Sequence, residues 1–260
     1  MKRRDFVSVT TSAGLAAGPS AAAGPPAASA SSIFELRYFH LRNGSQVQRT
    51  TDFLGKYFLP AAQRAGVGPM GFFAAVIAEQ SPFAMALTSY ATLNAMAEAM
   101  DKIASDKEFQ KGFEEYNSMS ELSYIRMENS LLRGFDTWPN VVTPGARQPT
   151  RIFELRTYES NNLKAARRKI KMFDDGEAAI FKRLGMSPVF FGETIVGRNL
   201  PNLTYMLAFD NLAAREALWG KFGSDPEWQK LRSNPDLADA LIVSNISNAI
   251  LRPLPFSPIR

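Results

Sequence analysis

The chain contains no cysteine and a single histidine, His40, among its 260 residues. Without cysteine it has no disulfide scaffold, no thiol nucleophile, no iron–sulfur cluster and no zinc site with cysteine ligands. One imidazole also excludes metal sites built from several histidines and argues against a histidine-based catalytic triad within one chain. The sequence therefore predicts neither a metal site nor a cofactor.

Strong charge and long apolar runs are missing as well. The formal net charge of +5 is too mild to indicate a nucleic-acid partner. No segment approaches the roughly 18 uninterrupted apolar residues that a membrane span needs, so no transmembrane span is predicted. The sequence also has no glycine-rich phosphate loop and no nucleophile elbow. These absences exclude the enzyme classes that such motifs identify.

The first 30 residues have the composition of an export signal. Arg3 and Arg4 precede a weakly apolar stretch of Ser, Thr, Ala, Gly and Pro, and Ala28-Ser29-Ala30 supplies small residues for cleavage. This pattern predicts a twin-arginine signal peptide over residues 1–30. The alternative is a disordered tail with a chance pair of arginines. With the signal, the mature protein begins near Ser31 and is periplasmic or secreted.

An internal repeat governs the chain after residue 32. The pentapeptide Ile-Phe-Glu-Leu-Arg at residues 33–37 recurs 119 residues later at residues 152–156. With the same offset, most of the segment Ser105–Lys111 matches Ser224–Lys230, and Asn129 matches Asn248. A repeat this long indicates two domains rather than a solenoid. We expect domains over 31–133 and 151–260, joined by a proline-rich linker over 134–150.

Each copy shows the element order strand, helix, two strands, helix, short helix, strand. This is the ferredoxin-like order. Such a sheet carries helices on one side only, so two copies in one chain bury their other sides against each other. The expected fold is therefore α+β, with two tandem ferredoxin-like domains forming an intramolecular dimeric α/β-barrel. The expected elements lie at residues 33–39, 46–65, 70–79, 82–91, 92–103, a short helix from 105 and 122–133, then 152–158, 162–184, 188–197, 203–210, 211–221, 225–232 and 241–252.

The repeated segments resemble the NIPSNAP family. Phe-Glu-Leu-Arg at 34–37 and 153–156 is similar to the opening strand of NIPSNAP domains, and Ser224–Lys230 is similar to their short helix. The resemblance covers both copies and implies a dimeric α/β-barrel, often in an exported bacterial protein. It implies no catalytic residues, because the family has no agreed mechanism. The wider superfamily includes cofactor-free monooxygenases, isomerase-like enzymes and haem-handling enzymes, so the fold alone cannot choose among them.

The repeated Glu/Arg pairs are the first candidates for chemistry. Residues two apart on a strand point to one side, so Glu35 lies beside Arg37 and Glu154 beside Arg156. Because the neighbouring positions are apolar enough for the helix-covered side, we expect the charges to face the space between the sheets. The last strand of each copy brings four further candidates to the first strand: Asn129, Arg133, Asn248 and Arg252. The pairs are either a structural ion-pair network, which we prefer, or anchors for an anionic or carbonyl-bearing ligand.

His40 follows the first strand and could serve as a general base or haem ligand at a cavity mouth. An exposed histidine in a turn is the commoner outcome. Four aromatic residues could line a pocket for a planar apolar ligand, although such residues more often belong to the core: Phe39, Phe72, Tyr158 and Phe191.

Two functions remain open from the sequence. The first, which we prefer, is a non-catalytic module that binds a small apolar or anionic molecule or a protein. The second is a cofactor-independent monooxygenase or isomerase acting on an apolar carbonyl compound. A cavity between the sheets that is reached by Arg37, Arg156 and His40 would favour the enzyme. Association into a homo-oligomer is compatible with either function.

Overall fold

The computed structural model describes residues 31–118, 122–145 and 147–260. The signal peptide predicted over residues 1–30 lies outside the described residues. The first half of the chain contains four strands and their connecting helices, namely β1 (Ile33–His40), α1 (Ser45–Phe53), the π-helical turn η1 (Leu54–Phe58), α2 (Leu59–Arg64), β2 (Met70–Ile77), β3 (Phe83–Tyr90), α3 (Leu93–Ser105), α4 (Lys107–Asn117) and β4 (Arg126–Gly134).

The second half repeats this order of elements. Its elements are β5 (Ile152–Glu159), α5 (Leu163–Met172), the π-helical turn η2 (Phe173–Glu177), α6 (Ala178–Arg183), β6 (Pro188–Val196), β7 (Asn202–Phe209), α7 (Leu212–Ser224), α8 (Pro226–Arg232), η3 (Pro235–Leu237), α9 (Asp239–Ile242) and β8 (Asn245–Pro253). The bounds of β1, η1, β3, α3 and β4 all recur 119 residues later. This is the offset of the sequence repeat.

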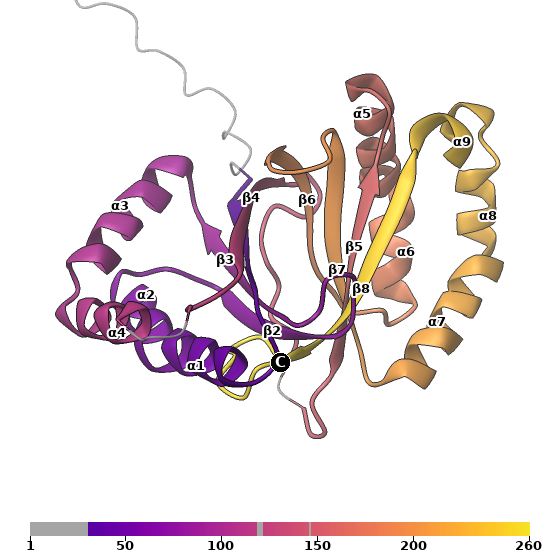
Figure 1. Cartoon of the computed structure of the whole chain (residues 1–260). Helices are drawn as coiled ribbons and strands as arrows, with labels where there is room; N and C mark the ends of the chain where they lie inside the picture. Colours follow the sequence, from indigo (N-terminus) through magenta and orange to yellow (C-terminus); the bar gives the residue numbers. More distant parts are fainter. Residues whose placement is uncertain (1–30, 119–121, 146) are drawn as a thin grey trace, which may run out of the picture.

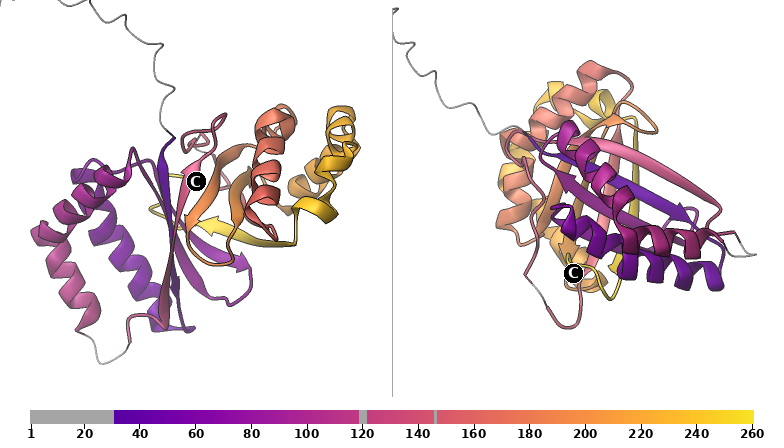
Figure 2. Two further views of the ribbon diagram at one scale, coloured as in Figure 1. Left: turned by 90° about the horizontal axis from the view of Figure 1, so that it is seen from above. Right: turned by 90° about the vertical axis from the view of Figure 1, so that its left-hand side faces the viewer.

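All eight described strands join one closed barrel in the order β1-β3-β2-β8-β5-β7-β6-β4. Two antiparallel pairings link the halves, β2 with β8 and β4 with β6. The helices of the first half cover one side of the barrel, and those of the second half cover the opposite side (Figures 1 and 2). The α+β class and the barrel are therefore confirmed.

Three apolar layers follow from this arrangement. The middle layer fills the barrel and draws on both halves, as the contacts of Phe34 with Phe190 and of Phe73 with Phe153 show. The two outer layers lie between the barrel wall and the helices of each half. Because an eight-stranded barrel is just wide enough for side chains to fill it, its interior selects the most apolar side of every strand.

The expected direction of the Glu/Arg pairs was therefore wrong. Phe34 and Leu36 point into the barrel, whereas Glu35 and Arg37 point toward the helices of the first half. The prediction assumed that the more apolar side of the strand must face the helices. On the helix side, however, a helix can bring polar partners to a buried charge, as Arg215 and Trp219 of α7 do for Glu154, and the closed interior of the barrel offers few.

Two details differ from the expected elements. The long helices expected at 46–65 and 162–184 are each interrupted by a π-helical turn, η1 or η2. The expected linker packs onto the barrel, where Phe135 and Val141 are buried. In the described part of the chain, no helix combines the length and the apolar character that crossing a bilayer requires.

Candidate ligand pocket

Glu35 is a buried carboxylate on the helix side of β1, and its side chain is 1% exposed. Arg37 donates to it from both Nε, at 3.2 Å, and Nη2, at 2.6 Å. Asn129 of β4 donates to the same oxygen at 2.6 Å, and the Tyr90 hydroxyl donates to the other oxygen at 3.1 Å. The Nη1 nitrogen of Arg37 makes no hydrogen bond within the described residues. The Glu35 carboxylate is thus fully hydrogen-bonded, and Arg37 Nη1 is available to another acceptor.

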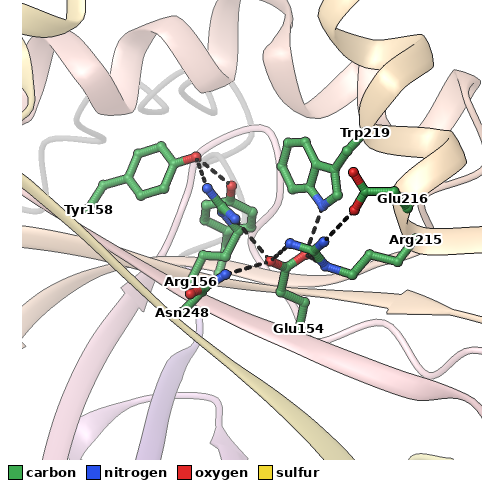
Figure 3. Close-up of polar contacts among 8 residues, drawn as sticks. Glu154, Arg156, Tyr158, Arg215, Glu216, Trp219 and Asn248 are labelled. Carbon is green, nitrogen blue, oxygen red and sulfur yellow. Dashed lines mark hydrogen bonds and ion pairs between the residues drawn. The ribbon is translucent and has the colours of Figure 1, made fainter. Parts of the chain in front are cut away.

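The equivalent carboxylate in the second half, Glu154, has a larger set of partners (Figure 3). Arg156 donates to it at 2.9 Å, and Arg215 of α7 makes two hydrogen bonds, at 2.6 and 3.0 Å. Trp219 and Asn248 donate at 2.8 and 3.1 Å. Although burial opposes it, these donors lower the pKa of Glu154 and keep it anionic.

Arg156 is enclosed as well. Its guanidinium lies over the rings of Trp219, at 4.6 Å, and Tyr158, at 5.4 Å, and Nη2 donates to the Tyr158 hydroxyl at 3.2 Å. The Tyr205 hydroxyl donates to the same Tyr158 oxygen at 2.9 Å. The second-half network is therefore a buried structural cluster, in which Arg156 Nε is left without a hydrogen-bond partner among the described residues. The preferred interpretation of the Glu/Arg pairs fits it.

The first half keeps a cavity where the second half is filled. The cavity has a volume of about 310 Å³ and lies between β1, β3 and the helices α1 and α4. Its lining is mostly aromatic, with Arg37 as the charged group, and comprises Arg37, Phe39, Phe53, Leu54, Phe58, Ala86, Phe109, Phe113, Tyr116, Asn117, Tyr124 and Met127. Phe113 and Met127 are each 47% exposed, so the cavity reaches the surface.

A change of side-chain size at one strand position contributes to this difference. Ala86 pairs with Arg37 across β1 and β3, and Tyr205 pairs with Arg156 at the equivalent position of β5 and β7. Tyr205 is fully buried, and its ring packs against Phe173, Phe181 and Phe191. Alanine leaves the corresponding volume open in the first half. The open space ends at the Arg37 guanidinium.

This geometry suits an apolar planar molecule that carries an anionic or carbonyl group. Aromatic side chains offer ring faces and edges to such a molecule, and a guanidinium binds a carboxylate or carbonyl oxygen. The π-helical turn η1 supplies Leu54 and Phe58 to the lining, and such turns are frequent at functional sites. Within the described residues, no group of three or more His, Asp or Glu side chains could hold a metal ion.

The remaining predicted site residues divide into three groups. Phe39 lines the cavity, whereas Phe72, Tyr158 and Phe191 are packed in the core. Arg133 and Arg252 are exposed and do not join the carboxylate clusters, so that expectation was wrong. Arg133 lies on the same side of β4 as Asn129 but pairs with Ile33, at the start of β1, rather than with Glu35 or Arg37. Of the four predicted β4 and β8 residues, only Asn129 and Asn248 bond to the carboxylates.

His40 is not an exposed turn residue, which also corrects the expectation. It is the last residue of β1 and is 6% exposed. It lies at the end of the barrel, away from Arg37 and Arg156, so the three do not share one cavity between the sheets.

Several important residues were missed from the sequence. Arg215 and Trp219 of α7 bind Glu154, yet their counterparts in the repeat, Met96 and Met100, gave no reason to select them. Ala86 was missed as well, although a signal for it existed. A comparison of side-chain volumes between the aligned copies would have set Ala86 against Tyr205.

Comparison with known proteins supports the fold of the chain and a NIPSNAP relationship of its second half. The NIPSNAP family model matches residues 153–258. A search of curated proteins found no match.

Several solved structures resemble the chain. A candidate monooxygenase from Fusobacterium nucleatum shares 9% identity with a TM-score of 0.57, and the match covers 86% of this chain and 93% of that protein. A second candidate monooxygenase, from Lactobacillus acidophilus, shares 10% identity with a TM-score of 0.56 and coverages of 85% and 93%. A NIPSNAP family protein of unknown function from Agrobacterium tumefaciens shares 23% identity over 46% of this chain and 100% of its own, with a TM-score of 0.39. The first two show that this chain has the fold of those proteins.

Proposed function

We propose that this protein is an exported NIPSNAP protein that binds a small apolar molecule through the first-half cavity. The ligand is planar, and its carboxylate or carbonyl oxygen contacts Arg37. The proposal includes the twin-arginine signal, a periplasmic or secreted location and two tandem ferredoxin-like domains of which only the first binds.

The observation that carries the proposal is the open volume beside Ala86. The chain contains two versions of one architecture, and the second shows that this volume can be closed by a tyrosine with its hydroxyl bonded. Closing it benefits stability, because a cavity in an apolar layer forfeits packing contacts. A half that keeps about 310 Å³ open next to a guanidinium therefore fits a binding role.

A binding role is favoured over catalysis by the lining of the cavity. Arg37 is its one charged side chain among the described residues, and Arg37 is already paired with Glu35. The lining tyrosines Tyr116 and Tyr124 can also exchange a proton, but the Tyr116 hydroxyl is already bonded to Thr50 and to the carbonyl of Ser123. The likeness to candidate monooxygenases is a likeness of fold, and function must be argued from the site.

Isothermal titration calorimetry with 2-naphthoate and 2-naphthol tests the proposal. We expect 2-naphthoate to bind with one site per chain and to bind more tightly than 2-naphthol, since only the carboxylate pairs with Arg37. Ala86→Phe should abolish binding, because the phenylalanine ring occupies the open volume. Phenylalanine is chosen over tyrosine because a tyrosine hydroxyl would lie beside Phe39, which cannot hydrogen-bond to it. Thr51→Val, a change on α1 whose hydroxyl bonds only to its own helix, is the control.

Two results would contradict the proposal. The first is the absence of binding by either probe to the folded chain. The second is unchanged 2-naphthoate affinity in Ala86→Phe with circular dichroism and thermal stability intact, because the probe then lies elsewhere.

A further inference from the structure

A second cavity opens at the end of the barrel where β1 and β5 finish. Its volume is about 210 Å³, far more than the roughly 10–15 Å³ that one water requires. Both halves contribute lining residues from equivalent strand positions, so the cavity has one wall from each half. Tyr38 of β1 faces this cavity together with its repeat counterpart, Thr157 of β5.

The two walls have different chemistry. The wall from the first half is aromatic, with Tyr38 stacked near His40 at 6.2 Å and Phe83 edge-on to both rings at 5.3 and 6.0 Å. At the position equivalent to Phe83 the second half has Asn202. The wall from the second half therefore carries hydroxyl and amide groups in place of rings.

The polar wall is held in a fixed arrangement. The hydroxyls of Thr157 and Thr204 are 2.9 Å apart, and Thr194 donates to Asn202 at 2.6 Å. The amide nitrogen of Asn202 donates to the carbonyl of Arg198 at 2.8 Å. Buried groups that position one another in this way form a preorganised surface for hydrogen bonds.

His40 is a buried group at this cavity that the protein itself leaves without a hydrogen bond. It is 6% exposed, and neither ring nitrogen has a hydrogen-bond partner within the described residues. Its Nε2 lies 3.4 Å from Glu128 Oε1, without the geometry of a hydrogen bond. An unpartnered buried polar group is costly, so a group in the cavity that bonds to His40 would bind favourably. A hydroxyl is suited to this role because it pairs with an imidazole nitrogen whether or not that nitrogen carries the proton.

Two carboxylates, Glu79 and Glu128, and two arginines, Arg126 and Arg198, lie at or beside the cavity, and Glu128 is paired with both arginines. Although burial opposes it, hydrogen bonds from Arg126 and Arg198 lower the pKa of Glu128 to about 2, so it is anionic. Burial raises the pKa of Tyr38, and its phenol therefore stays neutral and can donate. The cavity thus presents no excess of one charge to attract an ion.

From these features we infer that the barrel end binds a neutral polyhydroxylated ring of about monosaccharide size. One face of such a ring carries C–H groups that pack on the aromatic wall of Tyr38 and Phe83. Its hydroxyls hydrogen-bond to His40 and to the polar wall, where Thr157 and Asn202 lie. This site is separate from the cavity beside Arg37, and its test does not depend on the function proposed there.

Because His40 is the only histidine of the chain, nuclear magnetic resonance can test this site directly. The untagged, ¹⁵N-labelled full chain gives imidazole signals from one residue. We would titrate it with glucose, mannose, galactose and myo-inositol and follow both ring nitrogens. We expect a saturable shift of the His40 signals with at least one of the four probes.

Thr157→Val should lower the affinity for that probe by about fivefold, the loss expected for one neutral hydrogen bond. Ser247→Ala, at another lining position, repeats the test if Thr157→Val fails to fold. Thr51→Val on α1 serves as the control and should keep the affinity of the unmodified chain. The inference is overturned if none of the four probes shifts the signals. It is also overturned if acetate or phosphate shifts them and the neutral probes do not, since the site would then bind anions.

Discussion

Tyr205 and Ala86 occupy the same place in the two halves of the barrel, each opposite an arginine of the neighbouring strand. In one half the arginine contacts a tyrosine-filled, buried cluster, and in the other it borders an open cavity. The side chain at this position is therefore one of the differences between the filled half and the half with the cavity. The two halves serve as natural controls for each other, and most of the following predictions exploit this.

The first prediction concerns variants that exchange the small and the large side chain between positions 86 and 205. Tyr205→Ala should lower the free energy of unfolding by about 3–5 kcal/mol, since it empties a fully buried aromatic site. Ala86→Phe should raise it by about 0.5–2 kcal/mol, as cavity-filling changes do. Urea denaturation followed by circular dichroism measures both. A loss of stability in Ala86→Phe would mean that the open volume is smaller than the structure indicates.

The second prediction concerns the buried ion pair of Lys169 and Glu177, whose charged atoms are 3.1 Å apart with both side chains 2% exposed. The first half has Thr50 and Phe58 at these positions. Lys169→Thr alone should destabilise the chain by about 3–5 kcal/mol, because it leaves a buried carboxylate unpaired. Lys169→Thr combined with Glu177→Phe should recover most of that loss. A double variant no more stable than the single one, in the same denaturation experiment, would show that the pair contributes beyond its charge balance.

The third prediction compares the two repeated carboxylates. Glu154→Gln leaves two arginines, Arg156 and Arg215, without their shared anion, whereas Glu35→Gln removes the anion of one arginine, Arg37. We expect about 3–5 kcal/mol of destabilisation for Glu154→Gln and a smaller loss for Glu35→Gln. Differential scanning calorimetry of the two variants decides this order. Equal losses would argue that Arg215 and Trp219 do not depend on the carboxylate.

The fourth prediction is a dependence of stability on acid pH. Asp106 caps α4 and accepts two hydrogen bonds from Arg64, at 2.7 and 2.8 Å, and this arginine lowers the pKa of Asp106 from 3.8 to about 2. A carboxyl with a lowered pKa stabilises the fold above its usual pKa, and that stability is lost as the pH falls toward 2.

The melting temperature should therefore drop between pH 4 and pH 2 in the unmodified chain. Asp106→Asn keeps a capping side chain but cannot titrate, so its melting temperature should fall less over the same range. Asp225, the repeat counterpart, also has a lowered pKa and is paired with Arg183, so changing both residues should flatten the curve further. Identical pH profiles for all three proteins would contradict this assignment.

The sequence predicted the architecture well, because the repeat and the alternation of apolar residues are local signals. The pairing of Asn129 with Glu35 and of Asn248 with Glu154 followed from the order of strands alone. The direction of the charges did not, because period-two alternation identifies two sides of a strand without saying which is inside. To decide which side of the strand is inside, one must know that the barrel is closed, because its interior accepts only the more apolar side.

The cavities could not be predicted for a related reason. The open space beside Ala86 results from a difference between two copies, and neither copy alone contains that information. The burial of His40 depends on strands from both halves meeting at the barrel end. Contacts of this kind connect residues far apart in the chain, and no local pattern records them.

Closure of the barrel has a consequence for how this chain meets other molecules. Each of the eight described strands already has a partner on both sides. A peptide or a second copy therefore finds no free row of backbone N–H and C=O groups on which to extend the sheet, the route by which many strands recruit partners or aggregate. For the described strands and helices, association with another protein therefore relies on side chains, on the outward surfaces of the helices or at the mouths of the barrel.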